Sequence, residues 1–475
     1  MTLVAPNTQE ITVFARSERG TQSRFDIKNL AYSAAFVCVP RALLQRTRTN
    51  AQALLQGDRS IAARLAERPL RPLIDNFVKR PWGGSAIRGF KGLDAHTDTD
   101  DVPIGEAFEI AAFDADAEAC AHPSRLRLDD GSEISLPQLL AIHGADILGA
   151  DFVRRFGACF PLLPKTLDIG ELLSVQGHPP GNTEVYVIIA ADPGATIRLG
   201  FSENIAARDL QAELDAGLAE QRRLLQLLGE DVDQAALQRH MRPWLAERDV
   251  PPQALVQRLD QLRSASTGRD VERVLASLKR CYWRMLDGMN EIPVHAGQVI
   301  HNATPRRLLA AGSAPASAEV HALGNPERRE ILALEIRKPG PTFRAWDNVR
   351  FPLREVDVEA AIGALNLRKT EPLEFTVTPA PVPGRSGVLR SVDSEQYRIE
   401  HLEPGADSGV TVPHEPPHTL HVLAGAVRIY NARDEELIAM RRGESALVPC
   451  AVGEYRVTGD GAVAHVVKAS LPETG

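Results

Sequence analysis

The chain has few of the features that mark secreted, membrane or nucleic-acid-binding proteins. Its 475 residues include five scattered cysteines, without a CxxC or other close pair, so neither a disulfide framework nor a thiolate metal site is expected. The net charge is −8 and there is no long basic run, which argues against nucleic acid or an anionic membrane as a main partner. The apolar stretch 31–40 is roughly half a membrane span. The opening MTLVAPNTQEITVF lacks the basic-then-apolar order of a signal peptide. We therefore expect a cytoplasmic protein with reduced thiols and no membrane partner.

The chain does contain enough apolar sequence for more than one core. Hydrophobic residues make up 44% and charged residues 24% of the composition, as in ordinary globular proteins. A chain of this length exceeds what one hydrophobic core usually organises. We expect two or three domains.

The texture of the sequence changes several times along the chain. Residues 1–75 combine the strand-like ITVFA with good helix formers, and residues 76–202 read as short strands between Gly, Pro and Asp turns. Residues 203–290 carry leucines and valines at helical spacing. Strand texture returns at 291–375 and, after a Pro-rich segment, continues through 376–475. We expect a mainly β protein with an α insertion at 203–290, a barrel or sandwich formed by the stretches on either side of it, and a second small barrel at the C-terminus.

The clearest chemical signal lies in ELLSVQGHPPGNTE, residues 171–184. Alternate residues of a strand point to the same side, so Gln176 and His178 project together. Glu184 opens the next strand after a tight turn and can face the same cavity. An amide, an imidazole and a carboxylate suit zinc or another borderline divalent ion. A QxH pair alone is more often an ordinary polar pair at a strand end, so a histidine from a distant strand is needed to complete a site.

Several segments together resemble a known family. In chain order they are RPWGG (80–84), GEAFEI (105–110), AHPS (121–124), FPLLPKTLD (160–168), the QGHPPGNTE segment and LALEIRKPGPTFRAWD (332–347). Their order and content resemble the type I mannose-6-phosphate isomerases of the cupin superfamily. The resemblance implies two cupin-type (jelly-roll) barrels plus a helical domain. It also implies an enzyme that interconverts mannose 6-phosphate and fructose 6-phosphate, with a small sugar phosphate as its partner and one Zn²⁺ per chain.

The resemblance also assigns four metal ligands. Gln176, His178 and Glu184 fall on the first three. The fourth is a histidine, which we place at His321 in EVHALG because HALG and the following LEI match the family pattern together. His301 in AGQVIHN remains the alternative.

Four further residues fall on positions that line the family's active site. Arg344 and Glu335 are implied as catalytic residues, and Lys165 and Ser174 lie near the substrate's phosphate. The chemistry is coherent, because aldose–ketose isomerisation develops negative charge on sugar oxygens that a dication and an arginine can stabilise. A carboxylate, a histidine or a metal-bound water could carry the proton, and the sequence does not say which.

The sequence departs from the family at a few positions. Asn182 stands where a lysine usually lies two residues before the metal-binding glutamate, and Gly340 and Pro341 stand where an acidic residue is common. A related sugar phosphate or an unphosphorylated sugar is therefore an alternative substrate. A non-catalytic, cupin-like sugar-binding or regulatory protein is the alternative function. An oxygenase-type cupin is disfavoured, because such enzymes prefer histidine-rich clusters.

The C-terminal stretch contains a second group of ligand-type residues, Glu415, His418, His421 and His465. At strand spacing His418 and His421 point to opposite faces. We expect a structural barrel without a metal here, which resembles the family's non-catalytic C-terminal cupin.

Overall fold

The computed structural model describes residues 48–93, 102–113, 121–229, 231–259, 268–309, 315–406, 408–461 and 464–472, and the backbone of three strands before them. Those strands, β1 (Thr2–Val4), β2 (Glu10–Ala15) and β3 (Phe36–Pro40), pair in the order β1-β2-β3. The strand expected at ITVFA is thus β2. In the described part of the chain, no helix is both long enough and apolar enough to span a membrane.

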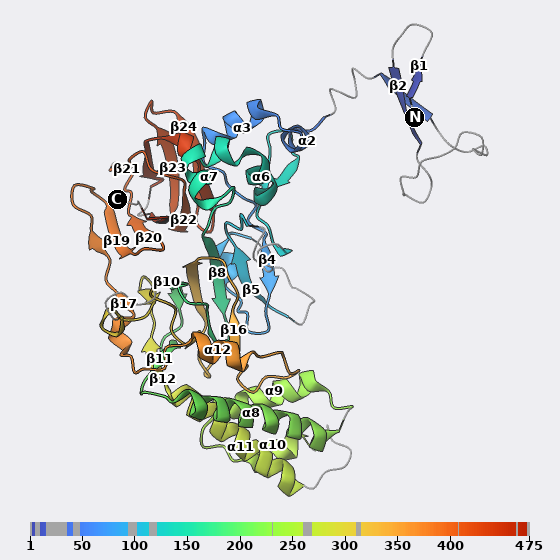
Figure 1. Cartoon of the computed structure of the whole chain (residues 1–475), viewed down its shortest axis with the longest axis vertical. Coiled ribbons are helices and arrows are strands. Elements are labelled where there is room, and N and C mark those ends of the chain that lie inside the picture. Colours follow the sequence, from blue (N-terminus) through green and yellow to red (C-terminus); the bar gives the residue numbers. More distant parts are fainter. Residues whose placement is uncertain are drawn as a thin grey trace.

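Two facing sheets form the centre of the molecule (Figure 1). One has the order β17-β13-β10-β15-β8-β5-β4 and the other the order β12-β11-β14-β9-β16. The first contains β4 (Phe77–Lys79), β5 (Ile104–Phe108), β8 (Leu163–Ile169), β10 (Glu184–Ala191), β13 (Val299–Asn302), β15 (Ile331–Arg337) and β17 (Thr376–Val377). The second contains β9 (Val175–Gly177), β11 (Thr196–Phe201), β12 (Met289–Pro293), β14 (His321–Ala322) and β16 (Phe343–Trp346).

Because side chains alternate along a strand, every second residue of these strands faces the space between the two sheets. On β10, Tyr186 and Ile188 belong to a buried cluster that also holds Ile197 and Leu199 of the facing sheet. The intervening Val187 belongs to a different cluster on the outer face. Apolar residues on alternate positions of strands from both sheets therefore build one core between them.

A second pair of sheets follows in the C-terminal part, drawn orange to red in Figure 1. Their orders are β18-β19-β20-β27-β22-β25 and β21-β26-β23-β24. The six-stranded sheet contains β18 (Ala380–Pro381), β19 (Val388–Asp393), β20 (Arg398–Leu402), β22 (His418–Ala424), β25 (Ser445–Val448) and β27 (His465–Ser470). The four-stranded sheet contains β21 (Val410–Val412), β23 (Ala426–Asn431), β24 (Glu436–Arg441) and β26 (Tyr455–Gly459). This pair encloses its own apolar core.

The outer face of the central seven-stranded sheet packs toward this C-terminal pair. One cluster joins Val187 and Leu334 to Tyr397 and Ile399 of the C-terminal part. The same cluster includes side chains of helices that cover this region: α2 (Asn50–Leu55), α3 (Arg59–Ala66), α4 (Ile87–Phe90), α6 (Leu136–Ile147) and α7 (Ala150–Phe156). The short hairpin β6 (Arg125–Arg127) and β7 (Glu133–Ser135) precedes α6.

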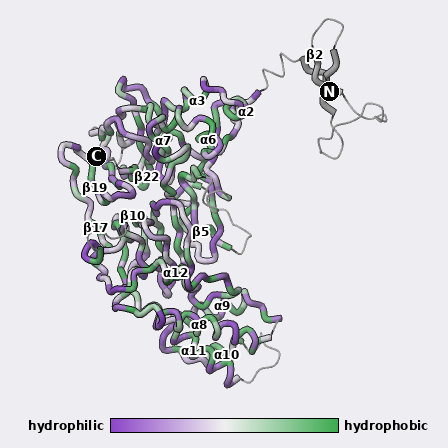
Figure 2. Tube along the Cα trace, in the orientation of Figure 1, coloured by the Kyte–Doolittle hydropathy of each residue, from purple (hydrophilic) through white to green (hydrophobic). Residues whose placement is uncertain are grey.

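Four helices interrupt the chain between the neighbouring strands β11 and β12: α8 (Ala207–Leu228), α9 (Gln234–Ala246), α10 (Pro252–Leu259) and α11 (Gly268–Asp287). They lie together at the lower end of Figure 1, and in Figure 2 purple and green alternate along them, as expected of amphipathic helices. Their buried side chains join Val175 and Trp346 of the five-stranded sheet in one cluster. A last helix, α12 (Val358–Ala364), contributes Ala361 to this cluster.

The expectation of a mainly β protein with helices is therefore confirmed, but α4, α6, α7 and α12 lie in stretches that the sequence pattern reads as strands. Among the described strands, however, hydrogen bonding closes neither pair of sheets into a barrel. The two sheets of each pair meet through side chains. Among the cysteines whose side chains are described, Cys281 and Cys450 are free thiols, and the Cys159 sulfur lies 3.3 Å from the carbonyl oxygen of Phe156.

Candidate metal centre

The space between the two central sheets is apolar at one end and charged at the other. On β8, β10, β13 and β15, the inward positions change from hydrophobic to polar along the strand. Leu167 and Ile169, for example, belong to the core, while two residues earlier the same face of β8 carries a lysine. The polar inward residues of these four strands are Lys165, Glu184, Asn302, Glu335 and Arg337. All five are buried.

The facing five-stranded sheet adds a second row of polar side chains. Gln176 on β9 pairs in register with His321 on β14 and with Arg344 on β16. Residues paired across antiparallel strands lie side by side on one face. His178, two residues after Gln176, continues the same face of the chain. Pairing across the sheet therefore gathers residues that are more than 140 positions apart.

One carboxylate joins the two sheets. Glu184 Oε1 lies 2.7 Å from His178 Nε2, and Glu184 Oε2 lies 3.3 Å from His321 Nε2. The amide of Gln176 lies 3.1 Å from His321 Nε2. The two imidazole rings stack with their centroids 5.2 Å apart. In the described part of the chain, His178, Glu184 and His321 are the group whose ligand atoms lie close enough together to hold a metal ion.

Both imidazoles direct Nε2 at Glu184. His178 Nδ1 lies 3.2 Å from the carbonyl oxygen of Pro341, and His321 Nδ1 lies 2.9 Å from that of Glu319. Because a carbonyl only accepts hydrogen bonds, each Nδ1 donates its proton there, and each Nε2 is the nitrogen that can bind either a proton or a metal ion. With Nε2 protonated, each ring pairs with the carboxylate; with Nε2 deprotonated, its lone pair and the carboxylate can bind one metal ion together.

His178 Nε2 is buried and has no hydrogen-bond partner of good geometry within the described residues. This orphaned atom, the backbone anchors of both Nδ1 atoms and the nitrogen and oxygen donor set all fit a zinc ion or a similar dication. A half-turn of the Gln176 amide would present its oxygen as a fourth donor. The residues present therefore suit the metal that the sequence implies.

Two further residues hold Glu184 in place. The Tyr186 hydroxyl donates to Glu184 Oε2, and Asn302 Nδ2 donates to the same oxygen at 3.3 Å. Burial raises the pKa of the Glu184 carboxyl, but the positive charge that His178 and His321 carry when protonated outweighs this effect and brings it well below its ordinary value. Burial and the Glu184 charge raise the pKa of Tyr186 well above its usual range, so the phenol stays protonated. The sequence reasoning missed both residues, although each occupies an inward position on its strand.

Charged residues extend from this centre toward β5 and β4. Lys165 Nζ lies 3.7 Å from Glu106 Oε1, and Arg80 Nη2 lies 2.6 Å from Glu106 Oε2. Glu335 faces Lys165 in strand register. Burial, followed by the charge of Glu184, raises the pKa of the Glu335 carboxyl. Arg80 and Glu106 lie within segments that carry the family resemblance, but their type alone did not single them out.

Arg344 and Ser174, the other predicted site residues, flank Gln176. Arg344 is half-buried, and its Nη1 donates to the carbonyl of Glu355 at 2.8 Å. Its Nε is buried without a hydrogen-bond partner among the described residues. Ser174 is buried two residues before Gln176 on the same side of the extended chain. The structure thus places all eight predicted site residues between the two sheets or at the edge of that space.

His301, the alternative fourth ligand, lies elsewhere. Its neighbours on β13, Ile300 and Asn302, face the interior, so His301 points to the outer face. There its ring packs 6.2 Å from the ring of Tyr397, and burial lowers its pKa to about 4. In this geometry His321, not His301, accompanies Glu184.

The C-terminal ligand-type residues do not come together. His418 lies between the Pro416 carbonyl and the Tyr455 hydroxyl, at 2.8 and 2.6 Å. His421 contacts the hydroxyls of Ser445 and Thr419. His465 pairs with His401 at 2.9 Å, and Glu415 contacts Lys468. Each of the four residues thus has partners of its own.

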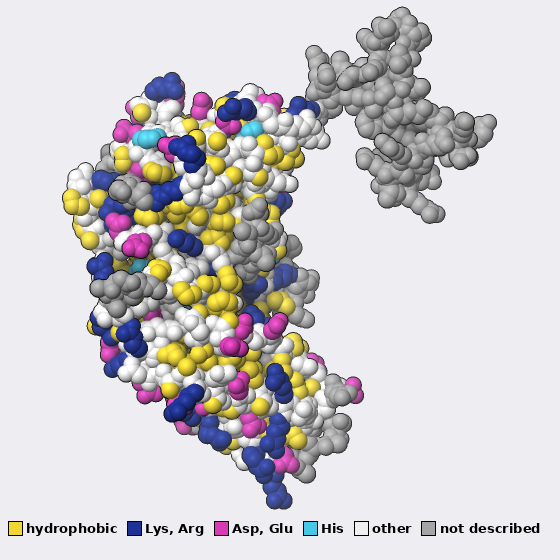
Figure 3. Space-filling model, viewed as in Figure 1, with side chains coloured by type: hydrophobic (Ala, Val, Ile, Leu, Met, Phe, Trp, Pro, Cys, Tyr) yellow, Lys and Arg dark blue, Asp and Glu magenta, His cyan; other side chains and the backbone are white. Residues whose placement is uncertain are grey.

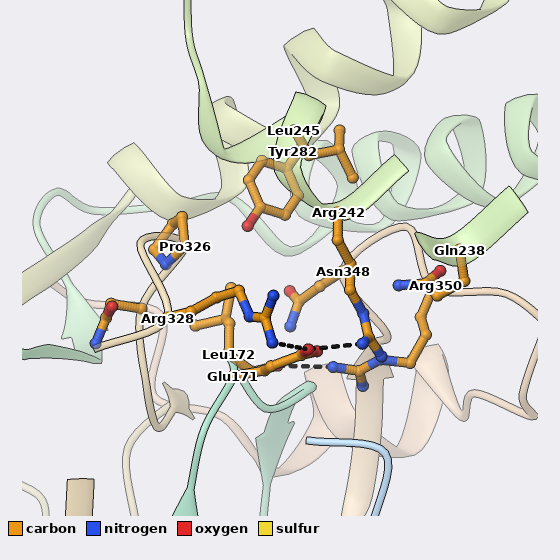
Figure 4. A pocket seen from close by; sticks show the side chains of 11 residues that line it. Glu171, Leu172, Gln238, Arg242, Leu245, Tyr282, Pro326, Arg328, Asn348 and Arg350 are labelled. Carbon is orange, nitrogen blue, oxygen red and sulfur yellow. Dashed lines mark hydrogen bonds and ion pairs between the residues drawn. The ribbon is translucent and has the colours of Figure 1, made fainter. Parts of the chain in front are cut away.

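A separate cavity of about 40 Å³ lies between the helices and the sheets (Figure 4). Glu171 Oε1 lies 2.6 Å from Arg242 Nη1 of α9 and 3.4 Å from Arg328 Nη2. Arg350 donates to the backbone carbonyl of Leu172. None of the predicted site residues lines this cavity. Its ion pairs connect α9 to the loop after β8, and thus hold the helices against the sheets.

The surface carries charge of both signs. On the face drawn in Figure 3, Lys and Arg side chains are interspersed with Asp and Glu. This mixture does not present a broad basic area on that face, in keeping with the net charge of −8.

Comparison with known proteins points to one family. The chain is 30% identical over 153 residues to a mannose-6-phosphate isomerase from Streptococcus mutans, an alignment that covers 29% of this chain and 42% of that protein. The chain therefore matches less than half the length of that relative. No protein-family model matches the chain.

Solved structures agree with this finding over a larger part of the chain. A mannose 6-phosphate isomerase from Bacillus subtilis superposes with a TM-score of 0.54 at 16% identity, covering 85% of this chain and all of that chain. A phosphomannose isomerase from Salmonella typhimurium gives 0.53 at 13% identity, over 86% of this chain and 100% of that chain. A mannose 6-phosphate isomerase bound with zinc and yttrium gives the same values. At these identities the likeness establishes a shared fold. Together the comparisons confirm the resemblance to mannose-6-phosphate isomerases that the sequence motifs indicate.

Proposed function

We propose that this chain is a zinc-dependent aldose–ketose isomerase that interconverts mannose 6-phosphate and fructose 6-phosphate or a closely related sugar phosphate. The observation that carries the proposal is the convergence of two imidazole nitrogens and one carboxylate in a buried space. The similarity to a curated mannose-6-phosphate isomerase and the shared fold support the choice of reaction.

In this proposal Gln176, His178, Glu184 and His321 hold one zinc ion. When bound, the ion would act as a Lewis acid on the oxygens at C1 and C2 of the open-chain sugar. Pro341 and Glu319 fix the ring orientations through their carbonyl oxygens, so that the two Nε2 atoms are already directed inward before a metal arrives.

Glu335 is the carboxylate we assign to moving the proton between C1 and C2. Glu184 is committed to the imidazoles, and Glu106 is committed to Arg80 and Lys165. Glu335 lies between Tyr186 and Lys165 in strand register, on the same inward face. One of its oxygens would take the proton from one carbon and return it to the other, so the reaction consumes no co-reactant.

Positive side chains would hold the anionic parts of the substrate. Arg344 lies at the half-buried edge of the site, where its guanidinium can bind an enediolate oxygen or a phosphate. Lys165 offers a point charge from the buried side, and Ser174 a hydroxyl beside Gln176. These assignments suit a phosphorylated substrate.

The proposed enzyme has two β-barrels and acts in the cytoplasm. We interpret the two pairs of facing sheets as two cupin-type (jelly-roll) barrels. The catalytic barrel then comprises 76–202 and 291–375, the helical insertion 203–290 and the C-terminal barrel 376–475. We place the enzyme in the cytoplasm.

Metal analysis combined with an isomerase assay tests the proposed function. We expect about one zinc per purified chain and conversion of mannose 6-phosphate to fructose 6-phosphate that is lost on chelation and restored by zinc. His321→Gln should lose bound zinc, while the matched variant His301→Gln should retain it. A zinc-loaded chain that is inert toward every hexose phosphate would favour the alternative, a non-catalytic sugar-binding protein. Equal zinc loss in both histidine variants would contradict the ligand assignment.

A further inference from the structure

An arginine that no motif singled out lies inside the candidate site. Arg337 is the last residue of β15 and pairs in register with Glu184 on β10. Its side chain is 3% exposed. Arg337 Nε donates to Glu335 Oε1 at 3.2 Å and lies 3.8 Å from Glu184 Oε1. Its Nη1 donates to the carbonyl oxygens of Lys338 and Gly340, each at 3.1 Å.

This position has a clear electrostatic consequence. Glu184 and Glu335 are both buried, and two like charges close together in a space of low polarity repel each other strongly. A guanidinium that contacts both carboxylates neutralises part of this charge and fixes where Glu335 points. The backbone carbonyls anchor the guanidinium itself, so it cannot follow one carboxylate and leave the other.

We propose that Arg337 is a positioning residue that holds the Glu335 carboxylate in its working orientation beside Glu184. The catalytic consequence rests on the isomerase function proposed above. The structural consequence, a buried cation needed by two buried carboxylates, does not.

The residues around Arg337 allow its positive charge to be supplied from a different position in the chain. Asn182 Nδ2 donates to the same Lys338 carbonyl oxygen at 3.1 Å, so the side chains of residues 182 and 337 converge on one atom. Asn182 is buried and lies two residues before Glu184. A lysine at position 182 would therefore bring its ammonium group to the space that the Arg337 head occupies, once that head is removed.

The test compares Arg337→Met, Arg337→Lys and the double variants Arg337→Met/Asn182→Lys and Arg337→Met/Asn182→Gln. The glutamine variant can still donate to the Lys338 carbonyl but carries no charge. For metal-free protein we expect Arg337→Met to lower the unfolding temperature by about 5 °C or more, because two buried carboxylates lose one of the cations that contact them. Lysine at 182 should restore much of this loss and glutamine should not.

Activity provides the second readout. Arg337→Met should lower kcat by about 10- to 100-fold, the range typical of residues that orient an active group, with KM and zinc content nearly unchanged. Arg337→Lys and the Asn182→Lys double variant should recover part of kcat. Arg350→Met is the matched control, since Arg350 is another buried arginine, bound to Asp347 and a carbonyl near the separate cavity. It should lower the unfolding temperature without changing kcat.

The outcomes separate the two proposals. If glutamine at 182 restores the unfolding temperature as well as lysine does, or if neither restores it, the charge of Arg337 is not what matters. Arg337 then acts only through its hydrogen bonds to backbone carbonyls, and the inference is wrong. If the wild-type protein isomerises no hexose phosphate, the proposed function fails, while the unfolding temperatures of the metal-free variants still decide the role of Arg337.

Discussion

The two pairs of sheets differ in what stabilises their buried carboxylates. Both enclose buried carboxylates at one end of an apolar core. In the C-terminal pair, Lys468 Nζ lies 2.9 Å from Glu400 Oε2 and also contacts Glu415. In the central pair, Glu184 faces the Nε2 atoms of two imidazoles, and Arg337 contacts it from one side. One interior thus contains its own cation at the centre, whereas the other presents a donor set that a dication from solution can complete.

The histidines of the two pairs differ in whether Nε2 already has a hydrogen-bond partner. Nε2 of His418 accepts a hydrogen bond from the Tyr455 hydroxyl at 2.6 Å, so its lone pair is already used. Nε2 of His178 has no such partner among the described side chains. Residue type alone does not distinguish a metal-binding histidine from a structural one. What differs is whether a neighbour already satisfies the inward nitrogen, and this is what separates a ligand set from a structural network.

The largest expected effect comes from removing the carboxylate of the central pair. Glu184→Gln should reduce zinc content from about one per chain to near zero, because a neutral amide replaces the anion that both imidazoles face. Atomic emission on dialysed protein measures the content. Glu400→Gln, the equivalent change in the C-terminal pair, should leave it unchanged. Zinc loss in the Glu400 variant would contradict the assignment of the metal to the central pair of sheets.

Removing the internal cation of the C-terminal pair should be costly but metal-independent. Lys468→Met removes the most buried partner of Glu400 and Glu415. Since Arg385 and Arg390 still contact Glu400, we expect the free energy of unfolding to fall by less than the roughly 3–5 kcal/mol typical of an unpaired buried charge. Urea denaturation measures this change. Zinc content should remain at one per chain, and a second bound zinc in this variant would show that the C-terminal interior is also a metal site.

Arg344→Ala should lower kcat/KM by about 100-fold, the expected loss for a charge that binds an anionic group in a partly buried site. Arg354→Ala is the matched control, because Arg354 pairs with Asp347 in the same stretch of chain. Its kcat/KM should change by less than about tenfold. Steady-state kinetics with mannose 6-phosphate measures both. Equal losses would mean that Arg344 acts through the local fold.

The smallest effect at neutral pH concerns the C-terminal histidines. Burial lowers the pKa of His401, His418 and His421 to about 4, 3 and 4. Below about pH 6.5 the unfolded chain binds protons that the folded chain does not, so stability falls as the pH drops from about 6.5 to 4. Urea midpoints at pH 7 and pH 5 measure this, and His421→Gln should reduce the difference. A difference unchanged in this variant would contradict a neutral, buried His421.

Much of this organisation can be predicted from the sequence, because it is periodic. Strand alternation correctly placed Gln176 and His178 on one side and separated His418 from His421. Helical spacing indicates helices in the stretch where α8 to α11 lie, between β11 and β12. Both features depend on neighbouring residues, and local sequence is informative about them.

Features that depend on strand pairing could not be predicted in this way. His301 and His321 both sit on strands, and only the pairing of His321 with Gln176 places one of them beside Glu184. Arg337 and Asn302 likewise join the site through their register with β10. Lys468 could not be expected to fill the C-terminal interior until β27 was paired with β20. Register between distant strands is a property of the whole fold.

X-ray absorption at the zinc edge tests the central claim most directly, because it reports the atoms around the ion in the intact protein. The account predicts one tightly bound zinc with only nitrogen and oxygen neighbours at about 2.0–2.2 Å and the scattering pattern of two imidazoles. Sulfur neighbours at about 2.3 Å, or the absence of bound zinc after dialysis, would contradict it.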